Sequence, residues 1–138
     1  PLKAYKNMNA YKLFVLDVGL LGAMSELPAE SILEGNDIFV EFKGALTEQY
    51  VLQQLISDTP YTPYYYGNEK ATFEQDFLIQ KEKSIVPIEV KAEQNIRSQS
   101  LKTYCEKFQP EEAVRFSTLK YKKQDWMVNI PLYAVCNL

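Results

Sequence analysis

Two short segments of this chain combine the pattern of buried strands with acidic side chains. Residues 73–79 read FEQDFLI and residues 85–91 read IVPIEVK, and both are rich in the β-branched and aromatic residues that favour strands. The polar residues 81–84 between them predict a hairpin turn. Side chains alternate between the two faces of a strand, so pairing of these strands brings Asp76, Glu89 and Lys91 to one place.

An amphipathic helix precedes this hairpin. The apolar residues between 42 and 57 recur at spacings of three and four, with Gly44 and the segment 57–60 marking the limits of the ordered part. Glu48 falls near the centre of the apolar stripe. A carboxylate there is costly unless it meets a cation or hydrogen-bond donors, so Glu48 is predicted to face the same cluster.

Two segments near the N-terminus also have recognisable patterns. The apolar run 12–17 is typical of a buried strand, and residues 19–24 suggest a short helix that Asp17 caps. Pro87 cannot donate a hydrogen bond to a neighbouring strand, which indicates a sheet edge or a bulge near the acidic cluster.

The remaining elements complete one sheet. Three tyrosines at 64–66 predict a strand, residues 98–100 offer an N-cap to a second amphipathic helix, and residues 113–118 read as a further strand. The core order is therefore helix, three strands, helix, strand. This order predicts an α/β domain with a central mixed sheet flanked by helices.

Composition limits the number of domains, the cellular location and the kinds of catalytic site that the chain can have. A chain of 138 residues with 46% hydrophobic content suits a single domain, residues 1–138. It has no histidine, which excludes histidine-based triads and most zinc hydrolase sites. No apolar run is long enough to cross a membrane, no signal segment opens the chain, and the two cysteines lie far apart, so we expect a soluble, cytoplasmic protein.

The acidic cluster has the composition of a metal site that cleaves phosphodiesters. Mg²⁺ or Mn²⁺ needs only one or two carboxylates besides water and substrate oxygens. Asp76 and Glu89 are the predicted direct ligands, and Glu48 is placed to hold a metal-bound water or a second ion. Lys91 is predicted to orient the attacking water or to neutralise charge in the transition state. The net charge of −3 argues against tight nonspecific binding to nucleic acid.

A family resemblance supports this interpretation. It is carried by KLFVLDVGLL at 12–21, GALTE at 44–48, DFLI at 76–79, PIEVK at 87–91 and Ser100-Leu101. Asp76, a spacer of twelve residues and then Glu-Val-Lys resemble the PD-(D/E)XK nuclease superfamily, with Gln75 where a proline is often found. Within that superfamily the chain is more similar to one branch, the domain of unknown function that follows the ATPase domain in a large family of bacterial and archaeal AAA-type ATPases.

This resemblance implies a restriction-endonuclease-like fold and a place C-terminal to an ATPase domain in cis, with ATP bound only by that missing N-terminal domain. It also implies DNA or RNA as a partner. A fold does not establish an activity, so a catalytically inactive module that binds a protein partner or regulates the ATPase is the alternative function.

Simpler structural roles remain open for the same residues. Asp76, Glu89 and Lys91 could form an ion pair on a solvated sheet face, which would contribute little to stability. Glu48 could form a buried salt bridge with Lys91 in an inactive relic of the fold. Tyrosines 64–66 could stack on nucleic-acid bases, although tyrosines on a strand are more often divided between core and surface.

Overall fold

A computed structural model describes residues 1–35, 37–67, 73–93 and 97–138 of the chain. Four helical elements precede the first strand: η1 (Leu2–Tyr5), α1 (Val18–Met24), α2 (Ala29–Glu34) and α3 (Asp37–Asp58). The rest of the chain forms β1 (Tyr64–Tyr66), β2 (Gln75–Lys81), β3 (Ser84–Lys91), α4 (Gln99–Phe108), β4 (Val114–Ser117), β5 (Lys122–Lys123), β6 (Val128–Pro131) and η2 (Leu132–Asn137). None of the helices in these described ranges has the length and apolar composition needed to cross a membrane.

The strands form one mixed sheet in the order β1-β2-β3-β4-β6-β5. Strands β1, β2 and β3 pair antiparallel, β4 runs parallel to both β3 and β6, and β5 pairs antiparallel with β6. The hairpin between β2 and β3 places Phe77 opposite Ile88 and Lys81 opposite Ser84. The predicted mixed α/β architecture and its order of elements are therefore confirmed.

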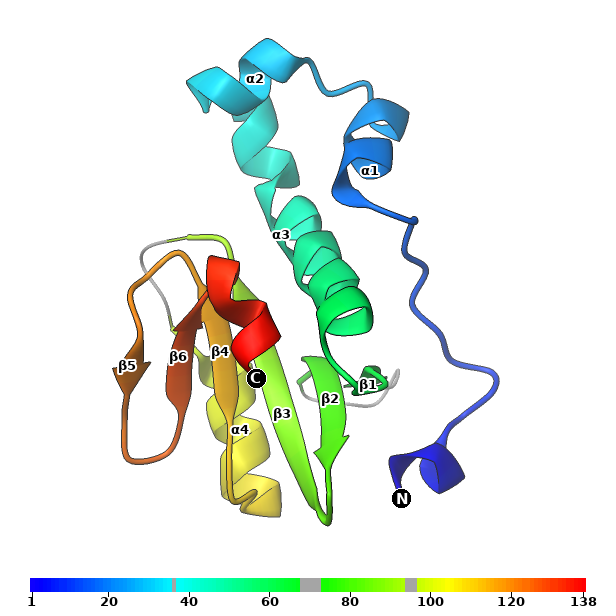
Figure 1. Cartoon of the computed structure of the whole chain (residues 1–138), viewed down its shortest axis with the longest axis vertical. Helices are drawn as coiled ribbons and strands as arrows, with labels where there is room; N and C mark the ends of the chain where they lie inside the picture. The colour runs from blue at the N-terminus through cyan, green and yellow to red at the C-terminus, as the bar shows by residue number, and fades with distance from the viewer. Residues whose placement is uncertain (36, 68–72, 94–96) are drawn as a thin grey trace.

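Helices cover both faces of this sheet. Figure 1 shows α3 and η2 on one face and α4 on the other. Val51 and Leu55 of α3 are fully buried in the main core cluster, together with Val135 of η2 and residues from β2, β3, β4 and β6. A second cluster contains Leu101 of α4, Ala113 and Met127. Because both faces are covered, the central strands are buried on both sides, and polar residues in them lose contact with water.

Two predictions about the N-terminal part are wrong. Residues 12–17 form no strand, and Leu13 and Leu16 are 86% and 82% exposed. This segment runs beside α3, where the side-chain amide of Gln49 bonds to both the N–H and the C=O of Val15. Gly44 lies inside α3, which begins at Asp37, so it does not mark the start of the helix.

The predicted capping role of Asp17 is confirmed, because its side chain accepts a hydrogen bond of 2.8 Å from the Leu20 N–H. The expectation for Pro87 is wrong in part. Strand β3 lies inside the sheet, between β2 and β4. Its pairing with β4 begins at Ile88, so the missing N–H of Pro87 falls just before that ladder. The irregularity in pairing lies instead between Tyr64 and Tyr66 of β1, where the register against β2 shifts.

Candidate functional site

Glu89 is the most unusual side chain in the sheet. It lies on the interior strand β3, and only 2% of it is exposed. Its Oε1 is 3.4 Å from the Lys91 ammonium, yet no described residue donates a hydrogen bond to either carboxylate oxygen. The ion pair is therefore loose, and both oxygens keep their lone pairs free in a place with little water.

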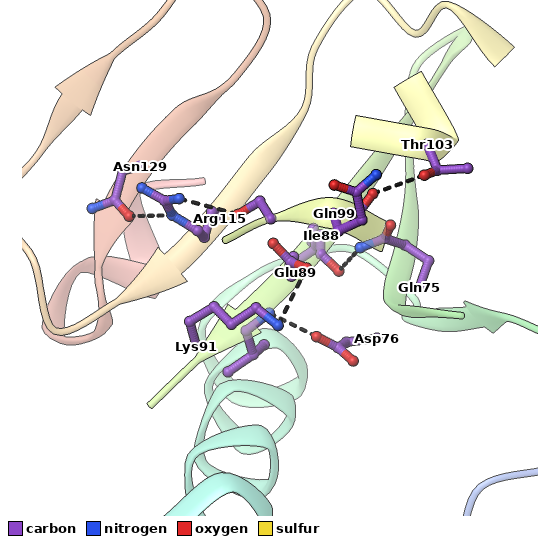
Figure 2. Close-up of polar contacts among 11 residues, drawn as sticks. Gln75, Asp76, Ile88, Glu89, Lys91, Gln99, Thr103, Arg115 and Asn129 are labelled. Carbon is purple, nitrogen blue, oxygen red and sulfur yellow. Dashed lines mark hydrogen bonds and ion pairs between the residues drawn. The ribbon is translucent and has the colours of Figure 1, made fainter. Parts of the chain in front are cut away.

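Asp76 lies beside Glu89 on the neighbouring strand β2. Its Oδ2 accepts a 2.7 Å hydrogen bond from the Val90 N–H, which fixes the carboxyl group against β3 (Figure 2). Burial raises the pKa of Asp76 to about 6, and the negative charges of Glu48 and Glu89 add to this rise, while the Val90 N–H and the Lys12 ammonium oppose it. Asp76 is therefore within electrostatic reach of two other carboxylates.

Glu48 reaches this cluster from α3, as predicted, but the cation that it meets is Lys12 and not Lys91. The Lys12 Nζ donates a 2.9 Å hydrogen bond to Glu48 Oε1, and the two side chains are 28% and 26% exposed. The expected alternative partner, Lys91, instead pairs with Glu89. The alternative role considered for Glu48, a salt bridge with Lys91, is thus wrong, because the N-terminal segment supplies a lysine beside α3.

Arg115 adds a third cation on the far side of Glu89. It lies directly beside Glu89 in the parallel pairing of β3 with β4. Burial lowers the pKa of the Arg115 guanidinium, and the charge of Glu89 opposes that change. Its Nε donates to Asn129 Oδ1 at 2.9 Å and its Nη1 to Ser98 Oγ at 3.0 Å, as Figure 2 shows. The guanidinium is therefore held by neutral partners, and its charge acts on Glu89 from a fixed position.

The arrangement fits a divalent cation in part. Carboxylate oxygens are the ligands that Mg²⁺ and Mn²⁺ prefer, and the unbonded oxygens of buried Glu89 beside Asp76 supply them. Within the described ranges, however, no three acidic, cysteine or histidine residues lie close enough together to hold a metal ion. Asp76 and Glu89 thus form the pair that could hold an ion, while Glu48 is engaged by Lys12.

A basic hollow adjoins the cluster at the end of β3. Its volume is about 480 Å³, and Lys43, Lys91 and Arg97 line it together with one carboxylate, Glu93. Lys91 also pairs with Glu89, so one side chain connects the hollow to the buried carboxylate. An anionic group in this hollow would find more positive than negative charge around it.

The sequence identified the acidic residues of the cluster and one of their cations, Lys91, but not Lys12 or Arg115. The charges of Glu48 and Glu89 both act on the carboxyl group of Asp76, and Lys91 joins the cluster through its ion pair with Glu89. An ion pair of Glu89 with Lys91 does form, but the prediction that it is solvated is wrong for Glu89, because only 2% of that residue is exposed. Arg115 could have been found by the signal that identified Glu89, a charged residue inside an apolar strand. No comparable signal marks Lys12.

Comparison with known proteins gives the chain a family. A search among curated proteins finds none that matches it. Residues 43–135, from the interior of α3 to η2, match the family described as Domain of unknown function (DUF4143). This match spans more than half of the 138 residues and contains all four predicted site residues. The chain therefore belongs to the DUF4143 family.

Proposed function

We propose that this DUF4143 domain is a metal-dependent nuclease-like module of the PD-(D/E)XK type, in which Asp76 and Glu89 bind Mg²⁺ or Mn²⁺ and the substrate is a nucleic-acid phosphodiester. The observation that carries the proposal is the Glu89 carboxylate, 2% exposed and without a hydrogen bond from any described residue, beside the half-buried carboxyl group of Asp76. A buried carboxylate of this kind is costly in a purely structural role.

The proposed reaction is hydrolysis. The oxygen of water forms a bond to phosphorus, the bond from phosphorus to the leaving oxygen breaks, and the proton lost by water balances the proton that the leaving oxygen gains. A bound divalent cation supplies Lewis-acid stabilisation of the phosphoryl oxygens and lowers the pKa of bound water.

Cationic side chains have the complementary task of binding the phosphate. Lys91 lies between Glu89 and the basic hollow, where its ammonium can stabilise the negative charge that develops on the phosphoryl oxygens. Lys43 and Arg97 line the same hollow and can bind a neighbouring phosphate of the chain. Glu48, freed from Lys12 by a conformational change, would add a third carboxylate.

Calorimetric titration with Mn²⁺ and a cleavage assay on single- and double-stranded DNA and RNA test the proposal. We expect Mn²⁺ binding and cleavage in the wild-type chain, and loss of both in Asp76→Asn and Glu89→Gln. Glu74→Gln is the matched control, because Glu74 is an exposed carboxylate two residues before Asp76. Mn²⁺ affinity equal in all four proteins, or cleavage that survives Asp76→Asn, would contradict the proposal.

A second candidate function is the inactive module that docks a partner or regulates an attached AAA-type ATPase. The ion pairs of the cluster favour it, because Lys12 pairs with Glu48 and Lys91 with Glu89, so two of the three carboxylates already have a cation in the absence of metal. Absence of Mn²⁺ binding in the wild-type chain, with an unchanged fold, is the result that would favour this function over the nuclease.

A further inference from the structure

A second hollow, to which Lys12 contributes, is lined by aromatic rings. Its volume is about 890 Å³, within the range of pockets that hold small ligands. It lies between the N-terminal segment, the end of α3 and strand β1, and we call it the tyrosine groove. Six tyrosines line it: Tyr5, Tyr11, Tyr61, Tyr64, Tyr65 and Tyr66.

One wall of the groove is held in place before any ligand binds. The backbones of Tyr64 and Tyr66 are fixed by pairing with β2. The Tyr66 ring stacks on Phe73 with ring centroids 5.5 Å apart and meets Tyr104 of α4 edge-on at 5.6 Å. Tyr5 and Tyr11, by contrast, are 85% and 72% exposed, so their rings are free to contact a ligand.

The charged side chains that line the groove are lysines, although the chain as a whole carries −3. Its described lining contains Lys6 and Lys12 and no carboxylate. The Lys12 Nζ lies 5.6 Å from the centre of the Tyr65 ring, so aromatic and cationic surfaces meet at one point. A polyanion with flat rings complements this surface better than a proline-rich peptide, which would match the aromatic rings but not the lysines.

Lys12 also connects the groove to the carboxylates. The same ammonium that lies over Tyr65 donates its hydrogen bond to Glu48, and its charge opposes the rise in the pKa of Asp76. A strand that placed bases in the groove would thus have its backbone next to the cluster.

We propose that the tyrosine groove binds the unpaired bases of single-stranded nucleic acid by stacking. This inference rests on the proposed function for its substrate class, nucleic acid, and it specifies that the nucleic acid is single-stranded. In a duplex the faces of the bases are already stacked on one another and cannot contact the tyrosines. Stacking on an aromatic ring contributes about 1–3 kcal/mol per base and tolerates any base, so it supplies the affinity that an acidic domain cannot obtain from phosphate contacts.

The test is binding of fluorescent 12-nucleotide oligomers, measured by anisotropy in EDTA so that no metal is bound and no cleavage occurs. The probes are oligo-dT, oligo-rU, an abasic DNA of equal length and a duplex. We expect oligo-dT or oligo-rU to bind at least ten-fold more tightly than the abasic and duplex probes. The ratio of the dT and rU affinities distinguishes DNA from RNA.

Variants locate the binding surface. Tyr11→Ala and Tyr65→Ala are each expected to weaken binding by about 5- to 150-fold, while Tyr65→Phe, which keeps the ring, restores affinity to within about two-fold. Tyr133→Ala is the control, because Tyr133 is, like Tyr11, an exposed tyrosine but lies on η2, outside the groove. Circular dichroism of each variant verifies the fold.

Three results would overturn the groove proposal: equal affinity for the abasic and dT probes, no effect of Tyr11→Ala, or binding of a proline-rich peptide without binding of oligonucleotides. None of these depends on metal. Stacking that persists in Asp76→Asn while cleavage is absent from every protein would reject the nuclease and keep the groove, and Asp76-dependent cleavage without stacking would do the reverse.

Discussion

Asp76 is held at a cost to the folded state. Its pKa is about 6 in the folded chain against 3.8 for an ordinary aspartate, so between these values the folded state binds more protons than the unfolded state. The free energy of unfolding therefore falls as the pH rises from about 4 to about 6. The difference corresponds to on the order of 3 kcal/mol above pH 6.

Asp76→Asn should for this reason stabilise the metal-free protein at pH 8. The amide oxygen can still accept the Val90 N–H, and the buried charge is gone. We expect a gain on the order of 1–3 kcal/mol in urea unfolding at pH 8 that shrinks toward zero at pH 4. A variant less stable than wild type at pH 8 would show instead that the Asp76 carboxylate supports the fold.

Asn129 is a second buried polar residue, and all its hydrogen-bonding capacity is used. Its Oδ1 accepts from Arg115 Nε and Ser117 Oγ, and its Nδ2 donates to the carbonyls of Leu119 and Lys120. It thus joins β6 to β4 and to the turn that follows β4, and it fixes the guanidinium that faces Glu89.

Asn129→Asp tests this network. The aspartate has no amide hydrogens, so the carbonyls of Leu119 and Lys120 lose their donors and face a negative oxygen. We expect a loss of about 2 kcal/mol or more in the free energy of unfolding, even though Arg115 is a cation. Asn137→Asp, at an exposed position on η2, should change stability by less than about 0.5 kcal/mol, and equal effects of the two substitutions would contradict this account.

Among the elements, the β2–β3 hairpin brings Asp76 and Glu89 together. Lys81 and Ser84 pair, and the two residues between them form the turn. Glu82 has a φ of 51°, in the left-handed region that a residue with a side chain rarely adopts. Glycine adopts this conformation without strain, and tight hairpin turns favour it at their first central position.

Glu82→Gly is therefore expected to stabilise the domain by about 0.5–1 kcal/mol, measured as a rise in the urea midpoint at unchanged slope. Lys83→Gly is the matched control in the same turn. Lys83 has no positive φ, so this substitution only adds freedom to the unfolded chain and should lower the midpoint. A lower midpoint for both variants would show that the Glu82 conformation carries no strain.

At the scale of the whole molecule, the net negative charge lies away from the two hollows that are proposed to bind nucleic acid. The chain carries −3, while lysines and Arg97 gather in the tyrosine groove and the basic hollow, where Lys12 and Lys91 already face carboxylates. Few cations remain to displace counterions from a nucleic acid. The affinity of this molecule for nucleic acid should therefore come more from base stacking than from the salt-dependent contacts to phosphate.

We accordingly expect a shallow salt dependence. Lys6, Lys43 and Arg97 are the cations of the two hollows that have no ion pair described, so the slope of log K against log salt for oligo-dT should be about −2. Anisotropy titrations in EDTA over a range of NaCl concentrations measure it. A slope steeper than about −4 would mean that phosphate contacts dominate the affinity.

Local features of the sequence were sufficient to predict the order of the core helices and strands. The period of apolar residues located α3, α4 and the β2–β3 hairpin, because periodicity and turn chemistry act over a few neighbouring residues. The same alternation placed Asp76 and Glu89 on adjacent strands, which is where the structure has them. Pattern failed for residues 12–17, where an apolar run matched a strand but no neighbouring strand was there to pair with it.

The sequence by itself thus determined a mixed α/β domain and the acidic residues of its candidate site, through interactions between near neighbours. Tertiary structure decided the rest: the burial of Glu89, the Lys12–Glu48 ion pair across 36 positions and the tyrosine groove that shares Lys12. The physical reason is that burial and ion pairing depend on which surfaces pack together. That packing brings distant segments into contact, and local sequence patterns do not predict which segments these are.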